Sequence, residues 1–228
     1  MRVEIDDQGA FGHAMVYLDD GETFHSESGA MFRSSPTIDV DVTTRSRGKG
    51  GLLSGVKRLL AGDNFFFSTY EARGGAGEVG LAPVLQGAVR EIPVETSEPW
   101  ICAGGSYLAS GPGLQVETQF QGLKGLFTGE SLFFVEVSGQ GPLLVSAFGF
   151  LEEIPITDGL IVDTGHVVAF TAGLEYTLEK AGGSWIQSWL AGEGVVLRFS
   201  GEGRVLVQSH NPKEFGQTVG GRLPARKG

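Results

Sequence analysis

The chain has 228 residues, and aliphatic residues, aromatic residues and cysteine make up 41% of it, which is enough to bury a core. The formal net charge is −10, and this acidic balance opposes nonspecific binding to nucleic acid because phosphates are repelled. The 37 glycines separate extended runs, a distribution that favours an all-β protein with many tight turns.

The N-terminal sequence MRVEIDDQGAF lacks the positively charged segment and following apolar run of a signal peptide. No uninterrupted apolar run approaches the ~18 residues that indicate a membrane-spanning helix. The chain has one cysteine, Cys102, so no disulfide forms within it, which fits a reducing compartment. We therefore expect a cytoplasmic protein, with association at a membrane surface as an alternative.

One sequence pattern occurs three times along the chain. The copies read GAMFRSSPTIDVDV from Gly29, GSYLASGPGLQVET from Gly105 and GHVVAFTAGLEYTL from Gly165. Aligned in this way, Ile38, Leu114 and Leu174 coincide. Self-similarity with a period of about 60 residues predicts a repeated structural unit.

Each unit is nearly a small domain, so a closed pseudo-threefold arrangement suits the chain better than an open array. We predict one domain built of three repeats over residues 1–87, 88–150 and 151–212. A flexible tail is expected over residues 213–228, because its end, GGRLPARKG, is rich in glycine and basic residues.

The first predicted strand of each aligned pattern alternates apolar and polar residues. Ile38, Val40 and Val42 alternate with polar residues, and the same pattern begins again at Leu114 and Leu174. This alternation is typical of an antiparallel strand with one buried and one wet face. The more continuously apolar runs FFFSTYE, LFFVEV and VVLRF predict strands buried on both faces. Short strands between glycines and prolines indicate sandwich or barrel units of six or seven strands each.

A helical segment interrupts the strands of the first unit. Apolar residues recur there at helical spacing before Gly62, and shorter apolar connections follow the corresponding strands of the other two units. The candidate interface therefore comprises Leu52, Leu53, Val56, Leu59, Leu60, Leu126, Phe127, Trp185, Ile186 and Trp189. These residues either close the end of each β unit or form an apolar surface for self-association, a partner or a membrane.

Basic residues gather beside this helical segment without an acidic residue among them. They are Arg45, Arg47, Lys49, Lys57 and Arg58. Such a patch attracts anionic lipid, at roughly 1 kcal/mol for each residue near the surface. It could equally bind an acidic face of another copy, or be a solvated loop without a partner.

The sequence offers little catalytic or metal-binding chemistry. The four histidines, His13, His25, His166 and His210, lack the close spacing of a cupin-like metal site. We interpret Asp163 and Thr164 as a turn in which His166 satisfies backbone groups. Cys102 lies in an apolar strand pattern and is expected to be a small core residue. No cofactor, metal or catalytic residue is predicted.

The longest of these motifs resemble those of a known family. The segments GGLLSGVKRLLAGDNFFFSTYEARGGAGEVGLAP, GGLKGLFTGESLFFVEVSGQG and IVDTGHVVAF are similar to signatures of the AIM24 family, and the likeness extends over essentially the whole chain. The resemblance implies a TRAP-like fold, in which three β units related to double-stranded β-helix proteins surround a pseudo-threefold axis. It implies no established enzymatic activity.

Two functional hypotheses of different classes follow, with a third more distant. The first is a non-enzymatic assembly or binding protein that forms a homo-oligomer, with a trimer as a plausible size, through the apolar connections. The second is a peripheral membrane factor that acts through residues 45–60. A cupin-like metalloenzyme is the third. No nucleic acid or small-molecule ligand is expected.

Overall fold

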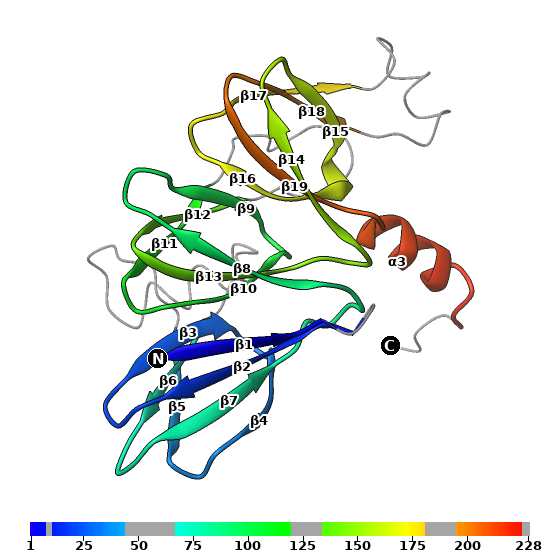
Figure 1. The fold of residues 1–228 in the computed structure, drawn as a ribbon. Coiled ribbons are helices and arrows are strands. Elements are labelled where there is room, and N and C mark those ends of the chain that lie inside the picture. Colours follow the sequence, from blue (N-terminus) through cyan, green and yellow to red (C-terminus); the bar gives the residue numbers. More distant parts are fainter. Residues whose placement is uncertain (8–10, 44–66, 120–133, 181–194, 225–228) are drawn as a thin grey trace, which may run out of the picture.

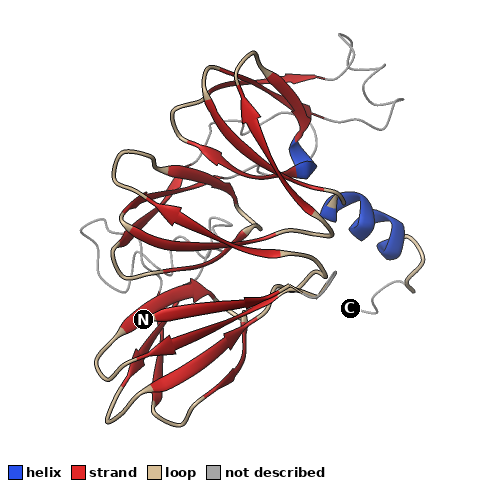
Figure 2. Ribbon diagram, viewed as in Figure 1, coloured by secondary structure: helices blue, strands red, loops and turns tan. Residues whose placement is uncertain are grey.

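The structure is a computed structural model that describes residues 1–7, 11–43, 67–119, 134–180 and 195–224. The described residues form an all-β protein, as the sequence predicts, with one 3₁₀ turn and one α-helix (Figure 2). The alternating strands predicted from Ile38, Leu114 and Leu174 are confirmed as β5, β11 and β17, although β17 begins one residue later, at Glu175. Their strand pairings, like those between all the named strands, are antiparallel.

The strands make four sheets, and the strands of each sheet lie side by side in the following order. The first contains β1 (Arg2–Asp6), β2 (His13–Leu18), β7 (Gly77–Leu81) and β4 (Met31–Ser34). The second contains β5 (Ile38–Thr43), β6 (Phe67–Ala72), β3 (Thr23–Glu27), β10 (Tyr107–Ser110), β13 (Gly141–Ser146) and β8 (Val89–Val94). The third contains β11 (Leu114–Gln119), β12 (Phe134–Gly139), β9 (Trp100–Ala103), β16 (Val167–Thr171), β19 (Gly203–Gln208) and β14 (Leu151–Ile156). The fourth contains β15 (Leu160–Asp163), β18 (Val195–Ser200) and β17 (Glu175–Lys180).

The four sheets are stacked, with a hydrophobic core in each of the three spaces between them (Figure 1). Val79 of the first sheet and Tyr70 of the second belong to one core, and Leu143 of the second sheet and Trp100 of the third belong to the next. Phe199 of the fourth sheet packs with Phe170 of the third, their ring centroids 5.0 Å apart. Each such side chain contributes about 1.5–3 kcal/mol by leaving water, so burial between sheets stabilises the whole stack.

The same strand order recurs three times along the chain. In the first part of the chain, β2-β7-β4 lie in one sheet and β5-β6-β3 in another. The second part repeats this arrangement as β8-β13-β10 and β11-β12-β9, and the third part repeats it as β14-β19-β16 and β17-β18-β15. A turn hydrogen bond recurs with them: Ile38 N, Leu114 N and Leu174 N each donate 3.1 Å to the carbonyl oxygen three residues earlier. These are the three residues that coincide in the sequence alignment. The register of each strand can therefore be compared across the three parts of the chain.

Two strand pairs join these three parts. β3 pairs with β10 in the second sheet, and β9 pairs with β16 in the third sheet. By the same rule β15 would pair with β4, but among the described strands β15 pairs only with β18, and β4 only with β7. No described strand pair therefore closes the three parts of the chain into a ring, and the closed pseudo-threefold arrangement stays a prediction.

The C-terminal segment contains a helix that extends into residues 213–228, where the sequence predicts a flexible tail. Helix α3 (Pro212–Gly220) follows β19, with residues 209–211 between them. The side chain of Asn211 accepts hydrogen bonds from Lys213 N at 3.0 Å and Glu214 N at 3.4 Å, which satisfies two amides of the first turn. Pro212 is tolerated at the helix start because its missing N–H has no partner there anyway. Throughout the described residues, no helix is long and apolar enough to cross a membrane.

Candidate functional site: the two end strands

The residues that the sequence singles out for an interface lie outside the described residues. The ten apolar candidates between Leu52 and Trp189 fall in residues 44–66, 120–133 and 181–194, and so do the five basic residues between Arg45 and Arg58. The predicted helix over residues 52–60 falls there too. The described part of the chain presents a different candidate, which is the pair of strands at the two ends of the stack.

Strand β4 at one end exposes apolar side chains. Phe32 is 52% exposed, and its ring meets His13 edge-on, with the centroids 5.7 Å apart. Arg33 forms an ion pair with Glu78 of the neighbouring strand. Phe32 forms a β-bulge, because Met31 pairs with Leu81 and Arg33 pairs with the adjacent Gly80. The second edge of β4 has no strand neighbour within the described residues.

Strand β15 at the other end also exposes an apolar residue. Ile161 is 52% exposed and lies opposite Arg198 of β18. Arg198 forms an ion pair of 3.0 Å with the exposed Glu179. As with β4, one edge of β15 lacks a strand neighbour in the described part of the chain.

The 3₁₀ turn η1 (Thr164–His166) holds the end of β15 in place. Gly165 N donates to Asp163 Oδ1 at 2.8 Å, and His166 Nδ1 donates to the carbonyl oxygen of Gln208 at 2.8 Å. Gln208 Nε2 returns a 2.8 Å bond to the carbonyl oxygen of Gly165. The structural interpretation of His166 is confirmed, since its ring satisfies a backbone carbonyl.

Residues at the equivalent positions inside the stack are buried. The bulge of β4 at Phe32 recurs at Leu108 in β10 and at Val168 in β16, and both of these are fully buried. Ile101 of β9, which occupies the position of Ile161, is only 6% exposed. The same strand positions are thus covered at the two junctions and open at the two ends.

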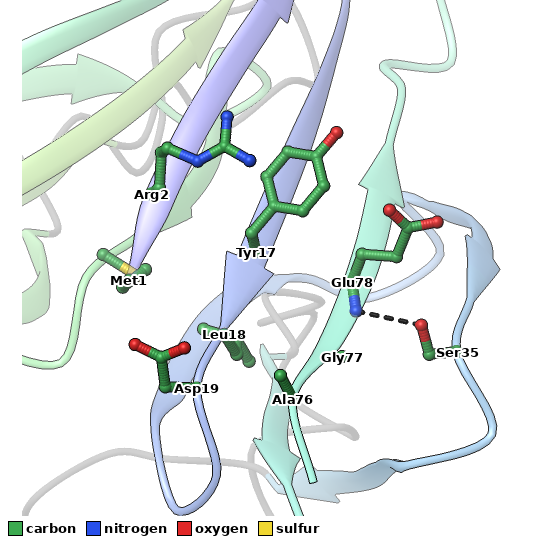
Figure 3. A pocket seen from close by; sticks show the side chains of 9 residues that line it. All are labelled: Met1, Arg2, Tyr17, Leu18, Asp19, Ser35, Ala76, Gly77 and Glu78. Atoms are coloured by element: carbon green, nitrogen blue, oxygen red, sulfur yellow. Dashed lines mark hydrogen bonds between the residues drawn. The ribbon is translucent and has the colours of Figure 1, made fainter.

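A hollow of about 540 Å³ lies beside the end of β4, and Figure 3 shows its lining. The lining residues are Met1, Arg2, Tyr17, Leu18, Asp19, Ser35, Ala76, Gly77 and Glu78. The Arg2 guanidinium lies 4.1 Å from the centroid of the Tyr17 ring, and Ser35 Oγ accepts a 3.0 Å hydrogen bond from Glu78 N. The lining holds side chains of both positive and negative charge. It contains no nucleophile paired with a base, so it does not indicate catalysis.

Titratable groups with raised pKa values lie on the junction strands β3, β9 and β10, where Cys102 and Tyr107 are fully buried and Glu27 is half-buried. Cys102 is fully buried, as predicted, and burial raises the pKa of its thiol to about 12, so the thiol is not reactive. Burial also raises the pKa of Tyr107, whose hydroxyl lies 2.7 Å from Ser110 Oγ. The pKa of the Glu27 carboxyl is raised to about 7 because burial disfavours its charged form.

The histidines do not form a metal site among the described residues. His25 lies in β3, with Nδ1 3.0 Å from Thr69 Oγ1, and Nδ1 of His210 lies 2.8 Å from Ser209 Oγ. The strand register makes His25 equivalent to Ile161, and His166 lies in the η1 turn. In the described ranges, no three His, Cys, Asp or Glu side chains could together hold a metal ion.

Comparison with known proteins places the chain in a family. Residues 3–210 match the family described as Mitochondrial biogenesis AIM24. The chain belongs to the AIM24 family. An uncharacterized protein of Streptococcus pyogenes serotype M6 is 29% identical over 230 residues, which cover 98% of this chain and 92% of that protein. A crystal structure of a Streptococcus pyogenes protein matches with a TM-score of 0.81 and 27% identity, covering 97% of this chain and 99% of the other.

The sequence alignment already contained a signal for the end strands. It placed the apolar pair Met31 and Phe32 beside Tyr107 and Leu108, which predicts similar strands. What it could not show is which of these strands has a neighbour on both sides. That property depends on which strands lie at the two ends of the stack.

Proposed function

We propose that this AIM24 family member is a non-enzymatic assembly protein whose copies associate end to end through β4 and β15. One observation carries the proposal: among the described residues, the edge that pairs twice inside the chain, as β3 with β10 and as β9 with β16, has no strand neighbour at β4 and β15. The strand order that recurs three times along the chain also supports three TRAP-like β units in each copy.

The physical reason lies in the groups that an open edge exposes. An unpaired strand edge presents backbone N–H and C=O groups that can pair with another chain. The apolar residues Phe32 and Ile161 lie on these two strands and lose contact with water when the strands are covered. The two edges differ from each other, so the contact is head to tail, and repetition gives either a closed ring or an open filament.

The test measures the mass of the protein in solution. Size-exclusion chromatography with light scattering is run over a wide concentration range, and we expect species of several times the 24.1 kDa chain mass. Ile161→Lys and Phe32→Lys each place a charge on one open edge and should return the protein to monomer. Val84→Lys is the matched control, because Val84 is 90% exposed and lies outside both strands. A wild-type protein that stays monomeric at every concentration would contradict the proposal.

A further inference from the structure

We infer that β4 and β15 of neighbouring copies meet in one defined register, in which Arg33 lies opposite Val162, Ser34 opposite Ile161 and Ser35 opposite Leu160. This inference rests on the proposed end-to-end association and specifies its geometry. It follows from the two junctions inside the chain, which provide a template for the contact between chains.

The two internal junctions share one register. At the first, Ala109 of β10 lies opposite Ser26 of β3. At the second, Ala169 of β16 lies opposite Cys102 of β9. Ala109 and Ala169 both directly follow the bulge of their strands, so the two junctions can be superimposed residue by residue. A pairing that occurs twice in one chain is the expected geometry for a third contact of the same kind.

The position of β4 in this template is fixed by its bulge and by its hydrogen bonds. Arg33 directly follows the bulge, as Ala109 and Ala169 do. Two residues further, Ser35 Oγ accepts from Glu78 N at 3.0 Å, and the equivalent Thr171 Oγ1 accepts from Arg204 N at 3.1 Å. Ser35 N donates to the Glu78 carbonyl at 2.9 Å, just as Gly111 N donates to the Pro142 carbonyl at 2.9 Å.

The position of β15 is fixed by the strands beside it. Val162 lies opposite Leu197 of β18, which lies opposite Leu178 of β17. In the preceding part of the chain, Cys102 lies opposite Val135 of β12, which lies opposite Thr118 of β11. Leu178 and Thr118 are both four residues beyond the aligned Leu174 and Leu114. Val162 therefore corresponds to Cys102, and its partner in the next copy is Arg33.

The residue after this edge does not obstruct the pairing. Pro36 follows Ser35 and has no N–H to donate to a neighbouring strand. Its equivalent at the first junction is Pro112, and β3 pairs with β10 there all the same. The proline at the open end is therefore compatible with the same contact.

The hollow in Figure 3 lies where the template places a turn of the next copy. At the second junction, a hollow of about 430 Å³ is lined on one side by the turn from Glu95 to Pro99 and on the other by Thr171 and Glu202. Thr171 corresponds to Ser35, which lines the hollow beside β4. We therefore place residues 157–159 of the neighbouring copy, which join β14 to β15, over the Ser35 side of that hollow.

Disulfide cross-linking tests the register directly. Cys102 is fully buried, so cysteines introduced at exposed positions react without interference. A Ser34→Cys chain is mixed with an Ile161→Cys chain under mild oxidation, and a covalent dimer should form on a non-reducing gel. The register control mixes Phe32→Cys with Ile161→Cys, since Phe32 lies two residues along β4. We expect the Ser34 mixture to cross-link at least tenfold faster than the control.

The outcomes separate the register from the association. If light scattering shows oligomers but the Phe32 mixture cross-links as fast as the Ser34 mixture, the register is wrong and the association stands. If both mixtures stay uncross-linked while oligomers are present, another surface joins the copies and the register is again wrong. If the protein is monomeric throughout, the proposed function fails and the register fails with it. Circular dichroism of each variant checks that its sheets are intact.

Discussion

The junctions inside the stack and its two ends use the same strand positions with opposite exposure. Leu108 and Val168 at the junctions are fully buried, whereas Phe32 at the end is half exposed. Within the described residues, the junction strands β3, β9, β10 and β16 have a strand neighbour on both sides, whereas β4 and β15 have a neighbour on one. The difference teaches that side-chain type does not decide burial in this fold. Position in the row of strands decides it, and a second copy can supply the missing neighbour.

The largest expected effect comes from placing the arginine of the open strand β4 at the equivalent position of a junction. Arg33 at the open end is equivalent to Ala109 at the first junction, and the Ala109 side chain is 1% exposed. Ala109→Arg should lower the free energy of unfolding by about 3–5 kcal/mol or prevent folding, because the guanidinium is buried without a partner. Urea unfolding measures this. Arg33→Ala is the matched control and should change stability by no more than about 1 kcal/mol, since it removes a surface ion pair and a weak hydrogen bond to Met15 Sδ. Equal effects of the two changes would contradict the opposite exposure of these equivalent positions.

The next effect compares two apolar residues at the bulge. Leu108→Ala should cost about 2–5 kcal/mol, because it leaves a cavity between the first two sheets. Phe32→Ala should cost about 1 kcal/mol or less in dilute protein, where its ring stays half exposed. The cost for Phe32 should grow with protein concentration, because association covers the ring. Denaturation curves at several concentrations measure the trend, and a constant difference between the variants argues against that covering.

A third effect concerns the carboxyl of Glu27 at the first junction. Burial raises its pKa from 4.5 to about 7, so between these values the folded chain holds a proton that the unfolded chain releases. Stability from this group is present below about pH 4.5 and is lost as the pH rises towards 7. Glu27→Gln should therefore raise the free energy of unfolding by about 1–3 kcal/mol at pH 8 and leave it nearly unchanged at pH 4.5. Urea unfolding at both pH values tests this, with the exposed Glu91→Gln as control. An equal gain at both pH values would show that ionisation is not the cause.

Much of the fold follows from local patterns in the sequence. The alternation from Ile38, Leu114 and Leu174 predicts strands, because a period of two places one apolar face on a core. The apolar context of Cys102 likewise predicts its burial, which the structure confirms. These are properties of short segments, so the sequence by itself contains them.

The remaining features depend on contacts between distant segments. The end strands stand out only once β3 is paired with β10 and β9 with β16, because an open edge is defined by the neighbour it lacks. The basic, glycine-rich end of the chain predicts a flexible tail. The structure instead has helix α3, which starts at the signal of Asn211 and Pro212. The polar cap of Asn211 is nevertheless a local signal for a helix that the sequence contains.

The smallest expected effect distinguishes the two ends from each other. β15 is continued by the η1 turn, where Asn211 Nδ2 lies 3.4 Å from Asp163 Oδ1 and the Asn211 side chain also caps α3. Asn211→Ala removes both contacts and should cost about 1 kcal/mol, with the loss confined to η1 and the first turn of α3. Hydrogen exchange should therefore speed up at the amides of Gly165, Lys213 and Glu214, and remain unchanged in β4 at the opposite end. Faster exchange across the whole chain would mean that Asn211 stabilises the stack instead of one end. Because β15 keeps its pairing with β18, the variant should still associate.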